Sequence, residues 1–356
     1  MGPMHKLNRY FATTISASIL LVLLVFLSLD LIGSIIDEVS DLGGNYTFLS
    51  AMKFVIFSIP GNIFNLLPFA ALIGCLAGLG TLAGNSELVV MRSAGVSTGR
   101  IVWMVMRPAI VIMLLGLLIS EYVAPHTENI AQSQRSTALR QTDNIVSSYG
   151  LWHREGNQFM HFDVVQPNGV LYGLTMYNFT DEGKLASALS AKRAIYQANH
   201  WLLEDIVESQ FLDDRVDSEV AASRPWSTEL SPTLLNILVL DPLDLSIRGL
   251  WRYSSYLQSQ ALNSGTYRLA FWKKVLQPLS TVALVLVAIS FIFGPLREVT
   301  MGYRIFVGVL VGIVFRITQD MLAPASLVYG FQPIYASLVP IVICFAGGFW
   351  FLFRAK

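Results

Sequence analysis

The pattern Gly95-Val96-Ser97-Thr98-Gly99 has the spacing of a hydrolase nucleophile elbow, which holds a serine on a sharp turn for attack on a carbonyl carbon. That chemistry needs a strand before the serine, a helix after it, and a histidine and an acid within reach. Here the serine follows a short polar segment between two long apolar runs, and the five histidines are scattered along the chain. We therefore interpret the pattern as a glycine-capped turn that leads into an apolar helix.

Other catalytic and cofactor patterns are incomplete. The run Gly78-Leu79-Gly80-Thr81-Leu82-Ala83 matches a dinucleotide fingerprint, but it lies inside an apolar run with no strand before it. The sequence has no G-x-x-x-x-G-K-[ST] phosphate loop, no H-E-x-x-H and no C-x-x-C. Cys75 and Cys344 lie in apolar runs, where cysteine usually serves as a packing residue. We expect no catalytic residue, metal site or bound cofactor in this chain.

Composition indicates an integral membrane protein. The chain is 54% hydrophobic and 13% charged, about half the charged fraction of soluble domains. A membrane-spanning helix needs about 20 mainly apolar residues. Six runs are long enough, at residues 11–36, 54–83, 101–123, 271–293, 305–322 and 333–353. They form two groups of three, so we predict six transmembrane helices in a 3+3 arrangement around one large insertion.

The short connections between these runs differ in charge. Basic residues gather at one end, at Lys6, Arg9, Arg92, Arg100, Arg107, Arg297, Arg304, Arg354 and Lys356. The opposite short connections hold mainly acids, at Asp37, Glu38, Asp41 and Asp320, with Lys53. Because Lys and Arg are enriched in cytoplasmic loops, we predict that both termini are cytoplasmic and that the insertion lies outside.

The insertion has the period of a β domain. Residues 121–266 carry 17 acids and 10 bases, whereas the rest of the chain carries 7 acids and 14 bases. Residues 158–165 and 170–179 alternate like half-buried strands, and 185–197 and 201–211 continue the pattern between turn signals such as Pro167-Asn168-Gly169 and Ala198-Asn199-His200. We predict membrane helices over 4–125, an all-β domain of jelly-roll type with flanking helices (128–140 and 245–264) within 126–266, and membrane helices over 267–356.

The polar segment between the second and third apolar runs predicts a short amphipathic helix over residues 85–95. Its signals are a cap residue at its start, an acid in the first turn at Glu87, an apolar stripe at Leu88, Met91 and Gly95, and a terminal Gly. Such a helix joins two spans at the cytoplasmic face, so a push on it moves both. We expect it to dock on a soluble partner through Ser86, Glu87, Leu88, Met91, Arg92 and Gly95.

Charged residues inside membrane spans are functional candidates by default. Arg316 and Asp320 are four residues apart, which also predicts a local ion pair. Asp30 has no obvious local partner, so it faces a cavity or reaches for the surface. Pro60 and Pro68 predict kinks that free carbonyls in the second span. The Gly74-x-x-x-Gly78 and Gly308-x-x-x-Gly312 pairs are candidates for close helix approach.

The combined motifs resemble the LptF/LptG family of permease subunits of the lipopolysaccharide-export ABC transporter, and the LptG type more than the LptF type. The string Ser86-Glu87-Leu88-Val89-Val90-Met91-Arg92-Ser93-Ala94-Gly95 is the most specific element. Nearly the whole chain takes part, through Leu7-Asn8-Arg9-Tyr10, Leu67-Pro68-Phe69-Ala70-Ala71-Leu72, Glu121-Tyr122-Val123-Ala124-Pro125, Ser290-Phe291-Ile292-Phe293-Gly294-Pro295-Leu296-Arg297 and Leu327-Val328-Tyr329-Gly330.

The resemblance implies a multi-pass subunit of the Gram-negative inner membrane with a periplasmic β domain. It implies an LptF-like partner in a heterodimer, an LptB-like ATPase dimer that binds ATP and Mg, an LptC-like single-span protein, membrane lipids, and no nucleic acid. Lipopolysaccharide would be drawn from the outer leaflet and passed to a periplasmic bridge. The substrate path that it implies contains Leu27, Asp30, Leu66, Phe69, Arg135, Phe315 and Arg316.

One region departs from the family pattern. Family members often place basic residues at the outer end of the first span, where they suit lipid A phosphates. This chain has Asp30, Ser34, Asp37, Glu38, Ser40 and Asp41 there instead. A direct lysine–phosphate contact is therefore in doubt, and a divalent cation bridging carboxylates to phosphate is the physical alternative. Arg135 matches a basic family position and is suited to core phosphates.

Three other functions remain open from the residues alone. A secondary transporter of another lipid or amphiphile would show inverted repeats and coupled intramembrane charges, but would leave the loop helix unexplained. An intramembrane hydrolase lacks its base and acid. A non-transporting scaffold would show no nucleotide-dependent change of conformation.

Overall fold

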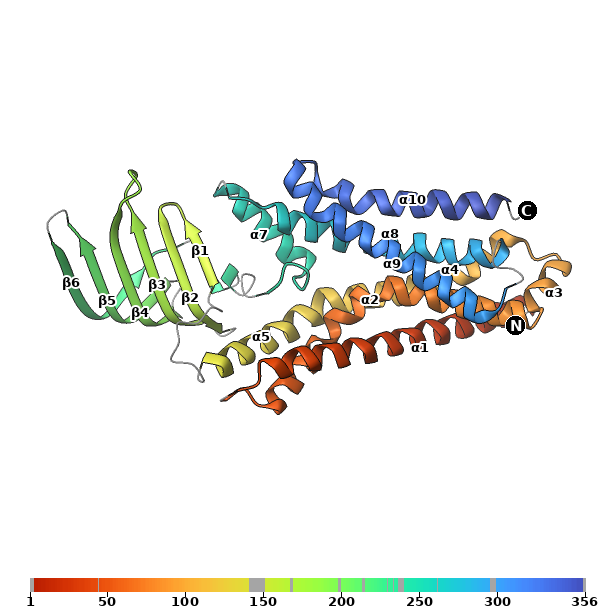
Figure 1. Ribbon diagram of the computed structural model, residues 1–356, viewed down its shortest axis with the longest axis horizontal. Helices are drawn as coiled ribbons and strands as arrows, with labels where there is room; N and C mark the ends of the chain where they lie inside the picture. The colour runs from red at the N-terminus through yellow and green to blue at the C-terminus, as the bar shows by residue number, and fades with distance from the viewer. Residues whose placement is uncertain are drawn as a thin grey trace.

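The computed structural model describes residues 3–354 except 44, 141–150, 167–168, 198–199, 213–214, 229, 233, 236–239, 261 and 295–298. The predicted turn residues Asn168 and Asn199 and the basic residues Arg297 and Lys356 lie outside this set. A helical bundle occupies one end of the molecule and a β-sheet the other (Figure 1). Both termini and the short helix α3 lie at the end of the bundle that is far from the sheet (Figure 1).

In the described residues, six helices are long and apolar enough to cross a membrane, as predicted. Five of these spans are α1 (Pro3–Ser40), α2 (Phe48–Gly84), α8 (Gly265–Phe293), α9 (Met301–Tyr329) and α10 (Pro333–Arg354). The remaining span begins with α4 (Thr98–Leu118). Each helix contains its predicted apolar run and extends beyond it, because helical backbone continues past the hydrophobic stretch.

The third span continues without a break. A π-turn, η1 (Ile119–Val123), joins α4 to α5 (Ala124–Arg140). The predicted separate helix at 128–140 is therefore the outer end of this span. The π-turn precedes Pro125, which has no N–H to complete a regular helical ladder.

The inserted domain is all-β, as predicted. It contains β1 (Leu151–Glu155), β2 (Gln158–Gln166), β3 (Val170–Phe179), β4 (Leu185–Gln197), β5 (His200–Phe211) and β6 (Val216–Trp226). Every neighbouring pair is antiparallel and the order is β1-β2-β3-β4-β5-β6. The described strands therefore form one up-and-down sheet, without the crossovers that link the two sheets of a jelly roll.

One face of the sheet is covered by the segment of the chain that follows β6. Phe162, Leu174 and Trp201 belong to its core, and Leu230 and Leu235 from the segment after β6 pack on them. The indole N–H of Trp201 donates to the Leu230 carbonyl oxygen at 2.7 Å. A separate amphipathic helix, α7 (Ile247–Ser259), leads from this domain to α8 and lies within the predicted range 245–264.

Glycines let three helices approach α2 closely. A Cβ on Gly74 would stand 2.5 Å from the Ile19 Cα of α1, and a Cβ on Gly308 would stand 2.4 Å from the Leu76 Cδ1. A Cβ on Gly116 of α4 would meet Leu67 Cδ1 at 2.0 Å. Both predicted glycine pairs therefore serve helix packing. As a result, α2 is the helix around which α1, α4 and α9 are arranged.

Gly74→Ala should destabilise the protein, because its Cβ would meet the α1 backbone, which cannot rotate away. We expect a loss of about 1–3 kcal/mol, the usual penalty for overpacking a close contact, seen as a lower thermal unfolding midpoint in detergent. Gly33→Ala is the matched control, since a Cβ there meets nothing within 4 Å. Equal midpoints for the two variants would contradict the close α1–α2 contact.

Candidate functional site

A polar cavity of about 200 Å³ opens between α1, α2, α8 and α9. Its polar lining residues are Asp30, Asn62, Asn65, Lys273, Gln277, Ser280, Arg316 and Gln319, with Leu66, Phe69 and Phe315 among its apolar ones. Five of the predicted path residues thus meet here: Asp30, Leu66, Phe69, Phe315 and Arg316. They come from three helices that are far apart in sequence.

Asp30 faces this cavity and has a partner. The Asn62 side-chain amide donates to the Asp30 Oδ2 at 2.7 Å. Asn62 follows Pro60 in α2, which places its amide beside the first span. The cavity alternative for Asp30 is therefore the one observed, and the sequence did not reveal Asn62 as its partner.

An apolar groove of about 520 Å³ continues from the polar cavity. Asp30, Leu66, Phe69 and Arg316 line both spaces, so the groove carries charge at one end only. The rest of its lining is apolar apart from Gly312, and consists of Phe26, Leu29, Ile73, Val309, Ile313 and Ile317. This arrangement suits an amphiphile with a polar head in the cavity and hydrocarbon in the groove.

The charges at the cavity form a three-residue network. The Arg316 Nε donates to the Asp320 Oδ2 at 2.6 Å, which confirms the predicted local pair. Lys273 of α8 adds a second cation, with its Nζ 3.3 Å from the Asp320 Oδ1. Lys273 was not identified from the sequence, because no spacing rule links α8 to α9.

Two predicted path residues lie elsewhere. Leu27 packs with a cluster that contains Leu23, Phe64 and Met113. Arg135 of α5 donates to Glu38 at 3.1 Å and to Asp41 at 2.5 Å. Both carboxylate partners of Arg135 belong to the chain itself, and its predicted contact with phosphates stays a prediction.

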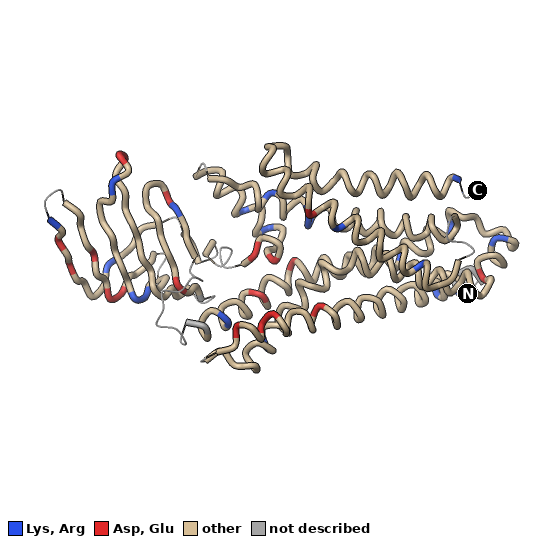
Figure 2. The backbone as a smooth tube through the Cα atoms, in the orientation of Figure 1, with Lys and Arg blue, Asp and Glu red and all other residues tan. Residues whose placement is uncertain are grey.

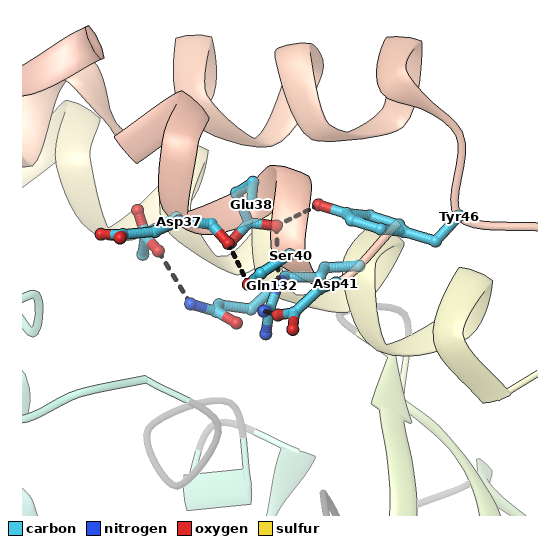
Figure 3. Close-up of polar contacts among 8 residues, drawn as sticks. Asp37, Glu38, Ser40, Asp41, Tyr46 and Gln132 are labelled. Atoms are coloured by element: carbon cyan, nitrogen blue, oxygen red, sulfur yellow. Dashed lines mark hydrogen bonds and ion pairs between the residues drawn. The ribbon is translucent and has the colours of Figure 1, made fainter. Parts of the chain in front are cut away.

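The same carboxylate contacts also stabilise the connection between α1 and α2. The Tyr46 hydroxyl donates to Glu38, and the Tyr46 side chain is buried (Figure 3). Desolvation by burial, followed by the hydrogen bond to Glu38, raises the pKa of Tyr46. Among the described residues no cluster of His, Cys, Asp or Glu is arranged to hold a metal. At this end of α1, Arg135 thus offsets part of the charge of Glu38 and Asp41, and a bridging divalent cation stays a prediction.

At the opposite end of the bundle, residues 85–95 contain the predicted helix as α3 (Glu87–Ser93). Gly95 has φ +86°, and Gly95 and Val96 donate to the Arg92 and Met91 carbonyls at 3.0 and 3.1 Å, which closes the helix. The predicted cap is wrong in its mechanism: Ser86 has φ 60° and its side chain makes no capping bond. Glu87 instead accepts from the Tyr10 hydroxyl at 3.2 Å and from the Asn85 amide at 3.3 Å.

The apolar residues of α3 that were predicted to face a partner face the bundle instead. Leu88 and Met91 are buried in the core of the bundle. The argument that they require an external partner is therefore wrong, because the chain itself covers them. Val89 and Val90 are 55% and 63% exposed and form the outward apolar face. That face, with Glu87 beside it, is the exposed surface of α3.

A buried polar belt joins the bundle to the inserted domain. The Lys274 Nζ of α8 donates to the Leu245 and Ser120 carbonyls at 2.6 and 3.2 Å. Glu121 accepts from the Ile247 backbone N–H at 2.7 Å, which fixes the start of α7. Asp244 lies beside this belt. Its burial, with smaller contributions from Glu128 and Asp241, raises its pKa to about 7.

Known proteins resemble this chain over nearly its whole length. The family model described as lipopolysaccharide export system permease LptF/LptG matches residues 9–354. The chain is 37% identical to the lipopolysaccharide export system permease protein LptG of Escherichia coli strain K12, over 99% of both chains. It is 33% identical to the protein of that name from Haemophilus influenzae strain KW20, again over 99% of both.

The elevated pKa of Asp244 predicts a pH dependence of stability. The native state holds this proton up to about pH 7, whereas an ordinary aspartate releases it near 3.8. The contribution of Asp244 is thus complete below pH 4 and is lost as the pH rises toward 7. For Asp244→Asn, the thermal unfolding midpoint should fall less between pH 4 and 8 than it does in the parent protein, because the contribution of Asp244 is absent. Glu182→Gln, in an exposed hairpin, is the control and should keep it; equal pH profiles for all three proteins would contradict the prediction.

Proposed function

We propose, from the premise that the chain belongs to the LptF/LptG family of lipopolysaccharide export permeases, that it is the LptG-type membrane subunit which draws lipopolysaccharide sideways out of the outer leaflet of the inner membrane. It is a multi-pass transport subunit, and the family is one of permeases. The hydrolase and scaffold hypotheses are therefore set aside. Secondary transport leaves α3 without a role.

The observation that carries the proposal is the polar cavity that continues into the apolar groove. Lipopolysaccharide has a charged, phosphorylated head and several acyl chains. The cavity presents Lys273 and Arg316, and the groove presents Leu29, Ile313 and Ile317. The groove is open on the side where α1 and α9 expose apolar residues, so we infer that these two helices bound the lateral entrance.

In this proposal, movement driven by ATP hydrolysis reaches the chain through α3. The chain has no phosphate loop, so ATP and Mg are bound and ATP is split by a separate LptB-like dimer. Val89, Val90 and Glu87 supply an apolar contact with a charge at its edge, and an arginine on the ATPase is the complementary group. An LptF-like subunit would complete the groove, and an LptC-like protein would join at the membrane.

The orientation follows from the charge pattern. Basic residues are concentrated at the end with α3 and the termini, whereas acids gather where α1, α2 and α5 approach the sheet (Figure 2). By the distribution of Lys and Arg we place α3 and both termini in the cytoplasm and the sheet in the periplasm. The sheet there would receive the lipid and pass it on, with β1 and β6 as open edges for strand addition to a partner.

Glu87→Lys tests the coupling role of α3. A charge pair broken on one side at an interface costs about 2–5 kcal/mol of affinity, so ATPase co-purification with the mutant should fall while its membrane insertion stays normal. Tyr10→Phe is the matched control, because it removes the internal hydrogen bond to Glu87 and leaves the carboxylate in place. Equal loss in both variants would assign Glu87 an internal role.

A photo-crosslinking amino acid at Ile317 tests the groove. Ile317 lines the groove and is 51% exposed, whereas Val342 of α10 is 53% exposed outside it. In membranes that contain the complete transporter, position 317 should capture lipopolysaccharide and position 342 should not. Capture at 342 with none at 317 would place the substrate path on another face.

A further inference from the structure

Arg304 is a buried arginine near the start of α9, at the end of the bundle that carries α3. It is 5% exposed, and its Nη1 donates to the Gly80 carbonyl oxygen at 2.9 Å. A guanidinium carries a permanent charge, and burying one is costly unless its donors are satisfied. The cavity and groove do not include Arg304, so substrate binding gives no reason for its position.

Gly80 is the residue that permits this contact. A Cβ there would stand 2.8 Å from the Met301 Sδ and 3.2 Å from the Arg304 Nη1. Gly80 lies four residues before the end of α2 at Gly84, and α3 begins at Glu87. The hydrogen bond from Arg304 to Gly80, which we call the Arg304 clamp, thus holds α9 to the turn of α2 that leads directly into α3.

The buried residues of α9 form a stripe along the helix, and α9 also packs on α10. Besides Arg304, its buried residues are Gly308, Gly312, Phe315 and Ser326. Gly308 and Gly312 rest on α2, at Leu76 and at Phe69 and Leu72. The stripe then reaches Phe315 and Arg316 at the cavity, about 17 Å along the helix from Arg304. One helix therefore connects the base of α3 to the substrate space, and most of its remaining surface is exposed.

We propose that Arg304 is a positioning residue that transmits displacement of α3 to α9, so that movement driven at the ATPase end changes the width of the groove. This inference rests on the proposed function, since it takes α3 as the docking helix and the groove as the lipid path. The bidentate-capable, rigid guanidinium suits this task better than an ammonium on a flexible stem. Lysine at this position keeps the charge and loses the fixed geometry.

The test uses the complete transporter in phospholipid vesicles that contain lipopolysaccharide. Spin labels at Val89 and Val111 report movement of α3, and labels at Leu29 and Ile317 report the width of the groove. In the parent, nucleotide should change both distances. In Arg304→Lys and Gly80→Ala the α3 distance should still change, the groove distance should not, and lipopolysaccharide exported per ATP hydrolysed should fall about fivefold or more.

Gly84→Ala is the matched control, because a Cβ there meets nothing within 4 Å, and it should behave like the parent. A clamp that merely stabilised the bundle would lower the unfolding midpoint and leave export per ATP unchanged, which would overturn the proposal. If the variants fail to assemble, the measurement is made on the parent transporter. A groove distance that stays constant when nucleotide moves α3 would also overturn the proposal. Loss of the proposed function would show differently, as a parent transporter that moves its groove without exporting lipopolysaccharide.

Discussion

A carbonyl freed by proline inside a membrane must find a donor from the protein, and two such carbonyls organise this bundle. Pro68 has no N–H for the Phe64 carbonyl, and the Gln277 side-chain amide supplies a donor at 2.5 Å. In the π-turn, Ala124 donates to the Ile119 carbonyl, so the next bond in that register would need the missing N–H of Pro125. Lys274 donates to the carbonyl left over, that of Ser120. Gln277 and Lys274 of α8 are therefore buried where the kinked spans leave carbonyls without a backbone donor.

These donors fix α8 against α2 and the third span, and the glycine contacts fix α1, α4 and α9 against α2 as well. α8 is held by side-chain bonds to backbone and is largely buried, whereas α1 and α9 rest on α2 at glycine contacts and expose much apolar surface. In the proposed function α1 and α9 bound the groove, and their exposed apolar surface suits a lateral entrance.

Much of the architecture could be predicted from the sequence, because it depends on period and length. The six spans, the short helix after the second span and four of the strands follow from hydrophobic runs and turn signals. β1 is only five residues long, and β6 is exposed along nearly all of its length, so neither shows the alternation that marks a half-buried strand. The helix at 128–140 merged with the third span because Pro125 is accommodated by a π-turn rather than by a break.

The site was less predictable, because its partners come from different helices. Sequence placed Asp30 and Arg316 in the membrane but gave no means to assign Asn62 or Lys273 to them. The prediction assigned the wrong face of α3 to the surface, because the spacing of Leu88 and Met91 suits either an external partner or the chain's own core. Arg135 was expected to be available to an anion, and only the fold brings Glu38 and Asp41 within reach of it. One signal was present: an acidic outer end of α1 needs a basic partner, and Arg135 lies just beyond a neighbouring span.

The charges around the cavity explain how an anionic lipid head fits a chain with so many acids nearby. The two cations Lys273 and Arg316 are balanced by Asp30 and Asp320, and the single cation Arg135 pairs with both Glu38 and Asp41. The chain alone thus holds no surplus positive charge at this site. In the proposed function, a phosphate would pair with Arg316 by taking the place of Asp320, and the displaced carboxylate would remain near Lys273. Affinity then depends on the exchange of one anion for another, a difference of two similar energies. Such binding is weak enough to be released, which a transporter needs at every cycle, and the apolar groove supplies the part of the affinity that the charges do not.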